Sequence, residues 1–180
     1  YKRQGKTRAE ATLPTPSGKI EARSRLWAAS GHDTLPPYTA PERPAAPDQF
    51  RVIPGRAALH TQASTTNNPL LSELAPTNTL WIHTERAQAL GIADGDWVEV
   101  CTATGPVGRL RAKVTTGIHP EAVFMLHGFG RKTPQETRAF GKGVADEACM
   151  VSGLEHEDPL GGGLALQKHF VTIRKAEETN

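Results

Sequence analysis

The sequence contains few of the residues that mark common function classes. Its two cysteines, Cys101 and Cys149, lie in apolar settings without CxxC spacing, so we expect buried free thiols rather than a disulfide, an iron–sulfur site or a zinc site. No apolar run is long enough to cross a bilayer, and no charged start with an apolar core marks a signal peptide. The formal net charge is only +2, and basic residues alternate with acids, which argues against nucleic acid or a membrane surface as partner.

Catalytic motifs are also missing. The seven histidines fall on separate predicted elements with no HExxH, so the sequence predicts no metal site. There is no GxSxG elbow and no local Cys/His signature. A self-contained hydrolase therefore has no support, and no catalytic residue is predicted. The histidines are His32, His60, His83, His119, His127, His156 and His169.

Length and composition predict one domain and a tail. The 180 residues, 37% of them hydrophobic, suffice for one core. The chain has no initiator Met, and residues 1–4 match the translation of a common sequencing-adapter end, so we expect an artefact there and the tail of a longer reading frame behind it. Five prolines between Leu35 and Asp48 disfavour both helix and central strand. We expect the tail of a preceding domain and a Pro-rich linker over 5–48, and a folded domain over 49–176.

From residue 49 onward the pattern is one of short strands and tight turns. Apolar runs predict six strands, over 50–54, 79–83, 97–102, 107–114, 122–126 and 169–174. One helix is well signalled, with Thr84 as its cap and Gly91 at its end. Asp94 and Asp96 flank Gly95 and are interpreted as turn formers rather than paired acids. Six short strands with one or two small helices predict a mainly β closed barrel.

The most informative stretch is Phe50–Asn68, FRVIPGRAALHTQASTTNN, where an apolar strand runs into a series of neutral hydrogen-bonding side chains. Such groups suit the edge of a polar heterocycle. We interpret the stretch as a ligand loop that lines an open concave face with its polar groups directed at the ligand. The alternative is a Ser/Thr/Asn-rich surface turn, and the loop alone does not decide between them. The candidate residues are Arg56, His60, Thr61, Gln62, Ser64, Thr65, Asn67 and Asn68.

A second candidate loop is HGFGR, His127–Arg131, where a predicted buried strand ends. Gly128 and Gly130 would let a ligand approach the main chain, and Arg131 would meet an anion in a fork geometry. The spacing is not that of a Walker loop. The alternative is a strand exit with ordinary turn glycines.

The order of segments along the chain resembles a known family. After HTQASTTNN come NPLLSELAPTNTLWIH, TERAQALGIADGDWVEV, TGIHPEAVFMLHGFG and DPLGGGLALQKHFVTIRK. In this order they resemble the C-terminal, molybdopterin dinucleotide-binding domain of the dimethyl sulfoxide reductase family of molybdopterin oxidoreductases, over about residues 50–175, and LPTPSGKIEARS is similar to the segment just before that domain. The stretches HTQASTTNN, HGFGR and FVTIRK are most similar to the thiosulfate, polysulfide and arsenate reductase branch.

The resemblance implies a fold, a cofactor and partners. The fold would be a double-psi β-barrel, and the cofactor molybdopterin guanine dinucleotide (Mo-bis-MGD, with tungsten as the less favoured metal) in the catalytic subunit of an oxidoreductase acting on sulfur or arsenic oxyanions or polysulfide. The metal ligand and any 4Fe-4S cluster would lie in the part of the enzyme ahead of this chain. The partners would be the remaining domains of the same subunit, an iron–sulfur electron-transfer subunit and a membrane anchor subunit, at the periplasmic or cytoplasmic face of a prokaryotic membrane.

The resemblance also implies cofactor contacts outside the first loop, at His127, Gly128, Phe129, Gly130, Asp146 and Lys168. Related enzymes commonly place Asn where Asp146 stands. An ionised carboxylate accepts hydrogen bonds but cannot donate, which puts direct contact at Asp146 in doubt. Lys168 keeps its donor character, although a Lys before an edge strand is often only a solvated charge.

Two other interpretations remain open from the sequence. The chain would be a separately encoded, cofactor-binding small subunit if a native start codon lay just upstream of Gly5. It would be a non-enzymatic β-barrel interaction module if no pterin accompanied the purified parent complex.

Overall fold

The computed structural model describes residues 13–35, 37–150, 153, 157–158, 162–164 and 166–177. It divides into two compact units, one formed by Tyr1–Pro41 with Pro159–Gly161 and the other by Glu42–Asp158 with Gly162–Asn180. The adapter-derived residues expected at 1–4 lie outside the described part.

In the part of the first unit that the structure describes there is one short helix, and none of its side chains is buried. Helix α1 (Arg25–Ala29) begins after Ser24, whose side chain accepts a hydrogen bond from Trp27 N. Leu26 is 73% exposed and Tyr38 is 86% exposed. Residues 42–48, by contrast, belong to the second unit, where Arg86 donates to Pro47 O and Ile173 N donates to Asp48 O. The boundary between the units therefore falls within the proline-rich stretch, at Glu42.

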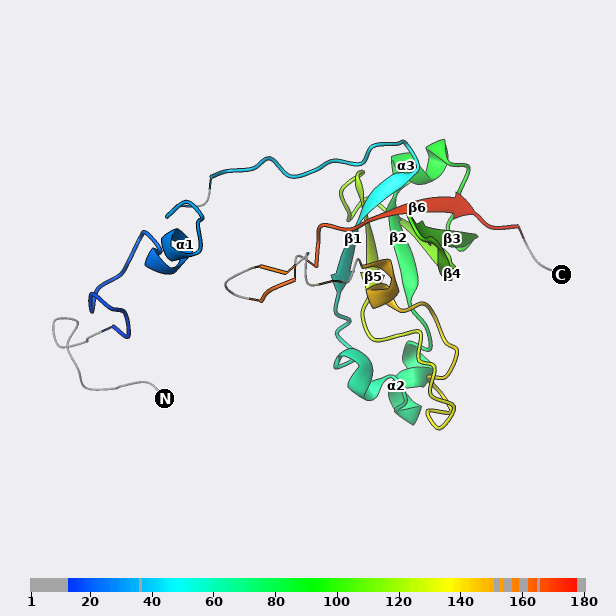
Figure 1. The fold of residues 1–180 in the computed structure, drawn as a ribbon. Coiled ribbons are helices and arrows are strands. Elements are labelled where there is room, and N and C mark those ends of the chain that lie inside the picture. Colours follow the sequence, from blue (N-terminus) through cyan, green and yellow to red (C-terminus); the bar gives the residue numbers. More distant parts are fainter. Residues whose placement is uncertain are drawn as a thin grey trace. The chain divides into compact units, whose positions relative to one another are not determined.

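The second unit is a closed barrel of six strands, in the order β1-β5-β2-β4-β3-β6 around the barrel (Figure 1). The strands are β1 (Gln49–Gly55), β2 (Thr79–His83), β3 (Trp97–Thr102), β4 (Gly105–Thr115), β5 (Ala122–Leu126) and β6 (Phe170–Lys175). All six predicted strands are confirmed, three of them with the predicted bounds. The mainly β closed barrel is confirmed with them.

The strand pairing identifies the type of barrel. Strands β1 and β5 are parallel, as are β2 and β4, while the other four neighbours are antiparallel. Exchanging each strand with the strand three places further along the chain reproduces the same set of neighbours with the same directions. This internal two-fold relation between β1–β3 and β4–β6 is that of a double-psi β-barrel, as the resemblance implied.

The barrel is filled by alternate side chains of its strands. Phe50 and Val52 of β1, with Leu80 and Ile82 of β2, are fully buried, because successive residues of a strand point to opposite faces. Burying a side chain of this size contributes roughly 1.5–3 kcal/mol. The same core cluster includes Val98, Val100, Leu110, Val123, Met125, Val171 and Ile173.

The helices of the second unit are short. In α3 (Thr84–Ala89) the cap is His83, whose side chain accepts from Glu85 N, so the predicted Thr84 cap is wrong by one residue. Gly91 has a φ of +65°, which confirms the predicted left-handed position after the helix. Helix α2 (Pro69–Leu74) and two 3-10 turns, η1 (Gln62–Thr65) and η2 (Asp146–Cys149), complete the described elements. Among the described residues, no helix is long and apolar enough to span a membrane.

The turn around Gly95 is structural. Gly95 has a φ of +83°. Asp94 Oδ1 accepts from Val114 N at 2.8 Å, and Asp96 Oδ2 accepts from Ala93 N at 2.8 Å. The interpretation of these acids as turn formers is therefore confirmed.

Candidate functional site

The candidate residues gather at one edge of the barrel because of the strand directions. The parallel strands β1 and β5 end side by side, with Gly55 opposite Leu126, and His127 N donates to Gly55 O at 2.8 Å. The antiparallel strands β2 and β6 begin at that same edge. We call this the loop edge, and define it by the segments 56–68, 127–131 and 143–149 that extend from it. Figure 1 shows α2 and the loop after β5 at this end of the barrel.

Half of the first loop's candidate side chains hold the loop itself together. His60 is 5% exposed, with Nδ1 3.3 Å from Thr65 Oγ1 and Nε2 3.0 Å from Ala75 O. Asn67 Oδ1 accepts from the main chain of Arg138 and Ala139. Asn68 Oδ1 accepts from Leu70 N and Leu71 N and so caps α2. These four side chains, His60, Thr65, Asn67 and Asn68, are satisfied within the chain rather than directed at open space.

The other half is exposed to solvent. Arg56, Thr61, Gln62 and Ser64 are all exposed. Gln62 has a φ of +50°, a left-handed conformation that costs a non-glycine residue about 1 kcal/mol. When the side-chain amide of Gln62 is oriented so that its oxygen faces donors and its nitrogen does not, the oxygen accepts from Arg56 Nε at 3.2 Å and from Arg56 Nη2 at 3.1 Å. The guanidinium of Arg56 therefore holds the loop through Gln62, and its remaining N–H groups can donate to a ligand.

In the second loop, the glycines serve the approach of neighbouring loops. A Cβ on Gly128 (φ +100°) would lie 2.6 Å from Ala63 N, and a Cβ on Gly130 (φ +75°) would lie 2.3 Å from Ala145 N. Phe129 is 3% exposed and meets His60 edge-on, with ring centroids 5.6 Å apart. The three loops are therefore packed against one another, main chain to main chain.

Arg131, expected to meet an anion, is already paired. Its Nε lies 2.7 Å from Glu136 Oε2 and its Nη2 lies 2.9 Å from Glu136 Oε1. The bidentate hydrogen bond raises the pKa of the guanidinium and lowers the pKa of the Glu136 carboxyl. The two hydrogen bonds between Arg131 and Glu136 thus stabilise the loop that follows β5.

Asp146 is the most deeply buried charged group at the loop edge. Its side chain is 0% exposed, and both carboxylate oxygens lie next to His127 Nδ1, at 2.9 and 3.0 Å. The His127 side chain is 39% exposed. Both carboxylate oxygens of Asp146 are thus engaged by His127.

Asn78 was not singled out from the sequence, yet it fastens the third loop. It is 1% exposed, donates from Nδ2 to Leu126 O at 3.0 Å and to Val144 O at 2.8 Å, and accepts from Val144 N at 3.0 Å. One side chain therefore joins the end of β5 to the segment that carries Asp146. A lone Asn before a strand has no sequence signal that separates this role from a surface turn.

Three groups near η2 have the character of metal ligands. One ligand atom each from His127, Asp146 and Glu147 lies within 4.8 Å of the others. Both oxygens of Asp146 are, however, engaged by His127 Nδ1. A cation here would have to displace that hydrogen bond, so the group is better described as a histidine–carboxylate pair.

Lys168 is exposed, on the segment that leads into β6. Val52 N donates to His169 O at 2.9 Å, which places that segment beside the second half of β1 and on the side of the loop edge. Arg51, a second cation next to this segment, donates a hydrogen bond to Gln167 O. Lys168 thus remains a cation available to a ligand at this edge.

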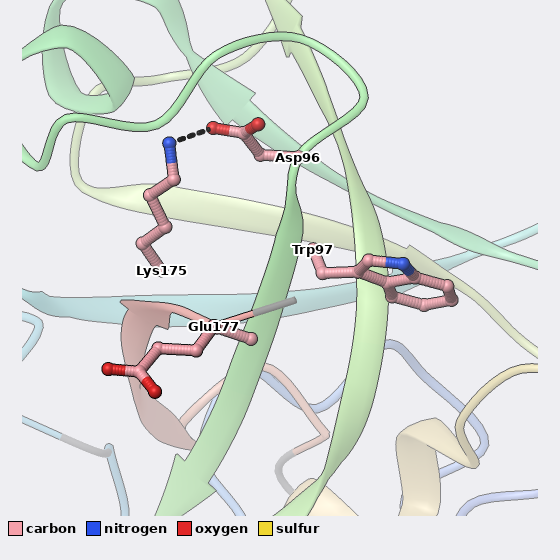
Figure 2. Close-up of a pocket in the computed structure, with 5 residues that line it drawn as sticks. Asp96, Trp97, Lys175 and Glu177 are labelled. Atoms are coloured by element: carbon pink, nitrogen blue, oxygen red, sulfur yellow. Dashed lines mark ion pairs between the residues drawn. The ribbon is translucent and has the colours of Figure 1, made fainter. Parts of the chain in front are cut away.

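A hollow at the opposite edge of the barrel does not resemble a binding site. It is lined by Asp96, Trp97, Lys175, Ala176 and Glu177. Figure 2 shows the Lys175 ammonium and the Asp96 carboxylate pointing toward one another, at 2.7 Å. Lys175 lowers the pKa of Asp96 through this hydrogen bond. The two charges satisfy each other, and this hollow offers a ligand little.

Both cysteines are free, as the sequence predicted, but only Cys149 is buried; Cys101 is half-buried, so the expected burial is wrong for it. Burial, together with the negative charges of Asp146 and Glu147, raises the pKa of the Cys149 thiol to about 12. Burial raises the pKa of Cys101 as well. Neither thiol is therefore disposed to act as a nucleophile or a metal ligand.

A double-psi barrel with one polar edge of packed loops defines a cofactor-binding domain. Residues 50–169 match the family model described as "Molydopterin dinucleotide binding domain", and the chain belongs to this family of molybdopterin-binding domains. Its cofactor is accordingly a molybdopterin, and the resemblance noted in the sequence is confirmed.

The chain is similar in sequence to two reductase chains. The chain is 39% identical over 134 residues to the thiosulfate reductase molybdopterin-containing subunit PhsA of Salmonella typhimurium, covering 72% of this chain and 17% of PhsA. It is 35% identical over 133 residues to the putative dimethyl sulfoxide reductase chain YnfE of Escherichia coli, covering 64% of this chain and 16% of YnfE. The chain thus spans less than a fifth of either relative.

Among solved structures, acetylene hydratase from Pelobacter acetylenicus shares the fold. The TM-score is 0.76 with 22% identity, covering 92% of this chain and 24% of the hydratase.

Proposed function

We propose that this chain is the cofactor-binding part of the catalytic subunit of a molybdenum oxidoreductase, and that Mo-bis-MGD is held against the loop edge. The observation that supports this most directly is the grouping there of exposed polar side chains on the first two loops, which pack against each other, with exposed Lys168 on the segment that leads into β6. Such a donor set fits a ligand that has both a phosphate anion and a polar heterocycle. The hollow at the opposite edge is lined by a closed ion pair, Lys175 with Asp96.

The candidate residues divide into two groups by what their side chains already do. Contact with the cofactor falls to the exposed groups, which are Arg56, Thr61, Gln62, Ser64, His127 and Lys168. Support of the loops falls to His60, Thr65, Asn67, Asn68, Gly128, Phe129, Gly130 and Asp146. When bound, the cofactor supplies two-electron redox chemistry at its metal, while the protein places and tunes it.

For the substrate we propose a sulfur oxyanion or polysulfide, with an arsenic oxyanion as the related choice. This is supported by the 39% identity to a thiosulfate reductase subunit. The remaining domains of the same subunit would supply the metal ligand and any 4Fe-4S cluster. An iron–sulfur electron-transfer subunit and a membrane anchor subunit would be its partners.

The enzyme that contains this chain tests the proposal. After purification we expect molybdenum and, on acid hydrolysis, guanosine nucleotide in constant ratio to protein. Reduction of thiosulfate, polysulfide and arsenate is then measured with a reduced viologen dye. Purified enzyme with no pterin would overturn the cofactor assignment, and turnover of none of the three acceptors would overturn the substrate assignment.

A further inference from the structure

His127, which is partly exposed, is hydrogen-bonded to the buried Asp146. This contact determines which nitrogen of His127 carries the proton. We propose that Asp146 is a positioning residue, which fixes the proton of neutral His127 on Nδ1 and so presents Nε2 as a hydrogen-bond acceptor to an N–H group of a purine- or pterin-type heterocycle. This rests on the proposed function, since the heterocycle is part of the cofactor that the loop edge would bind.

The proton position follows from the contact. Nδ1 lies 2.9 and 3.0 Å from the two carboxylate oxygens. A carboxylate only accepts hydrogen bonds, so Nδ1 donates and carries the hydrogen. In the neutral ring the lone pair is then on Nε2, on the far side of the imidazole from the buried acid.

Both residues are held from behind, so the pair is fixed in place. The main chain of His127 is tied to the barrel by its hydrogen bond to Gly55 O. Asp146 is the first residue of η2. Two residues earlier, the main-chain N–H and carbonyl of Val144 are both hydrogen-bonded to the side chain of Asn78. A ligand approaching the exposed part of the ring therefore meets Nε2 in one orientation.

Three other histidines show the opposite arrangement. The Nδ1 atoms of His83 and His119 accept from the main-chain N–H groups of Glu85 and Glu121, at 3.3 and 3.2 Å. His60 Nε2 faces the carbonyl of Ala75 at 3.0 Å and must donate to it. In their neutral rings the proton is therefore on Nε2. His127 differs from these three.

The partner must be a hydrogen-bond donor, because a lone pair cannot bind a phosphate oxygen, and the N–H groups of a heterocycle meet this requirement. Next in the chain, Gly128 packs against the main chain of Gln62 and Ala63, so His127 belongs to the same edge as the exposed Gln62 and Ser64. The amide and ring N–H groups of guanine and of pterin share the required chemistry.

Long-range ¹H–¹⁵N spectra of the 180-residue chain test the proton position without any variant. At about pH 8.5 we expect a pyrrole-type Nδ1 and a pyridine-type Nε2 for His127. His60, His83 and His119 should show the reverse. A pyrrole-type Nε2 on His127 would overturn the proposal.

Two substitutions separate positioning from folding. Asp146→Asn retains an oxygen that accepts from Nδ1 and should keep the His127 pattern, whereas Asp146→Ala should lose it. The dispersed amide signals of Val52 and Ile82 report an intact barrel. If Asp146→Ala folds and leaves the pattern unchanged, Asp146 does not set the proton.

Added ligands test the acceptor role. Guanosine diphosphate and 6-hydroxymethylpterin are titrated separately to tell the two heterocycles apart, and inorganic pyrophosphate serves as the probe without N–H groups. We expect one heterocycle to move His127 Nε2 in the wild type and to bind about tenfold more weakly to Asp146→Ala, the value of one hydrogen bond. Shifts in residues 56–68 that spare His127 Nε2 would overturn the acceptor role alone. No shift at the loop edge with any probe would count against the proposed function as well.

Discussion

At the scale of single residues, the loop edge depends on buried polar groups with complete sets of partners. Asn78 satisfies three main-chain groups and is 1% exposed. Asp146 satisfies His127 from a fully buried position. Leaving a buried polar group without a partner costs roughly 1–3 kcal/mol, so each of these side chains matters more for the loops than its size suggests.

We predict that Asn78→Ala destabilises the barrel by about 3 kcal/mol, because the carbonyls of Leu126 and Val144 and the N–H of Val144 lose a shared partner. Urea unfolding followed by tryptophan fluorescence measures the change. Gln88→Ala, at an exposed position of α3, is the control and should change stability by less than about 0.5 kcal/mol. A loss in Asn78→Ala no larger than the control's would refute the role given to Asn78.

The residue types in the sequence were enough to predict which loops form the candidate site. They did not predict which side chains of those loops are left without a partner in the chain and can bind a ligand. The sequence HTQASTTNN pointed to the first loop, and HGFGR to the second. Which hydroxyl or amide is used internally depends on partners far away in the chain, such as Arg138 and Ala139 for Asn67, about 70 residues on. That information enters only when the strands are paired.

At the scale of elements, the strands were predictable and the loops were not. Each strand is a short run of alternate buried residues, such as Thr79–His83, which a period of two detects. Asn68 followed by Pro69 is a cap with proline at the first helical turn, so α2 carried a readable signal that was missed. The 3-10 turn η2 contains Asp146, whose partner His127 lies on another loop, and a four-residue window does not contain that contact.

The packing of one loop on another gives a prediction for Gly128. Gly128→Ala adds a Cβ 2.6 Å from Ala63 N at a φ of +100°, and both the strain and the clash oppose it. We expect a loss of more than about 2 kcal/mol in urea unfolding. Gly141→Ala, with a φ of +66° and open space around the added Cβ, has the strain without the clash and should lose about 1 kcal/mol. Equal losses would show that Gly128 is needed only for its backbone conformation.

At the scale of the whole molecule, the chain divides into a barrel unit and a first unit. The predicted boundary at residue 49 followed from the prolines, which mark a linker but not what the linker touches. Arg43 pairs with Glu121 and Arg51 donates to Glu42 O, so the end of the linker contacts the barrel. Sequence alone had no means to detect these exposed pairings between distant residues.

We predict that a chain beginning at Glu42 unfolds at the same temperature as the full chain. A chain beginning at Gln49 should be less stable by about 1–2 kcal/mol, because it lacks the carbonyls of Pro47 and Asp48 that accept from Arg86 and Ile173. Calorimetry of the three chains measures the difference. A clear loss of stability in the chain that begins at Glu42 would show that the first unit supports the barrel.

The central claim is that the loop edge holds the cofactor, and cofactor content measures this most directly. In the full enzyme, Gln62→Ala with Ser64→Ala removes two exposed polar groups and should lower bound pterin and metal about tenfold or more, at roughly 1 kcal/mol for each hydrogen bond. Gln88→Ala with Thr116→Ala, two exposed positions away from that edge, is the matched control and should leave the content unchanged. Pterin and molybdenum at the wild-type level in a folded Gln62→Ala, Ser64→Ala enzyme, with unaltered turnover, would contradict the account.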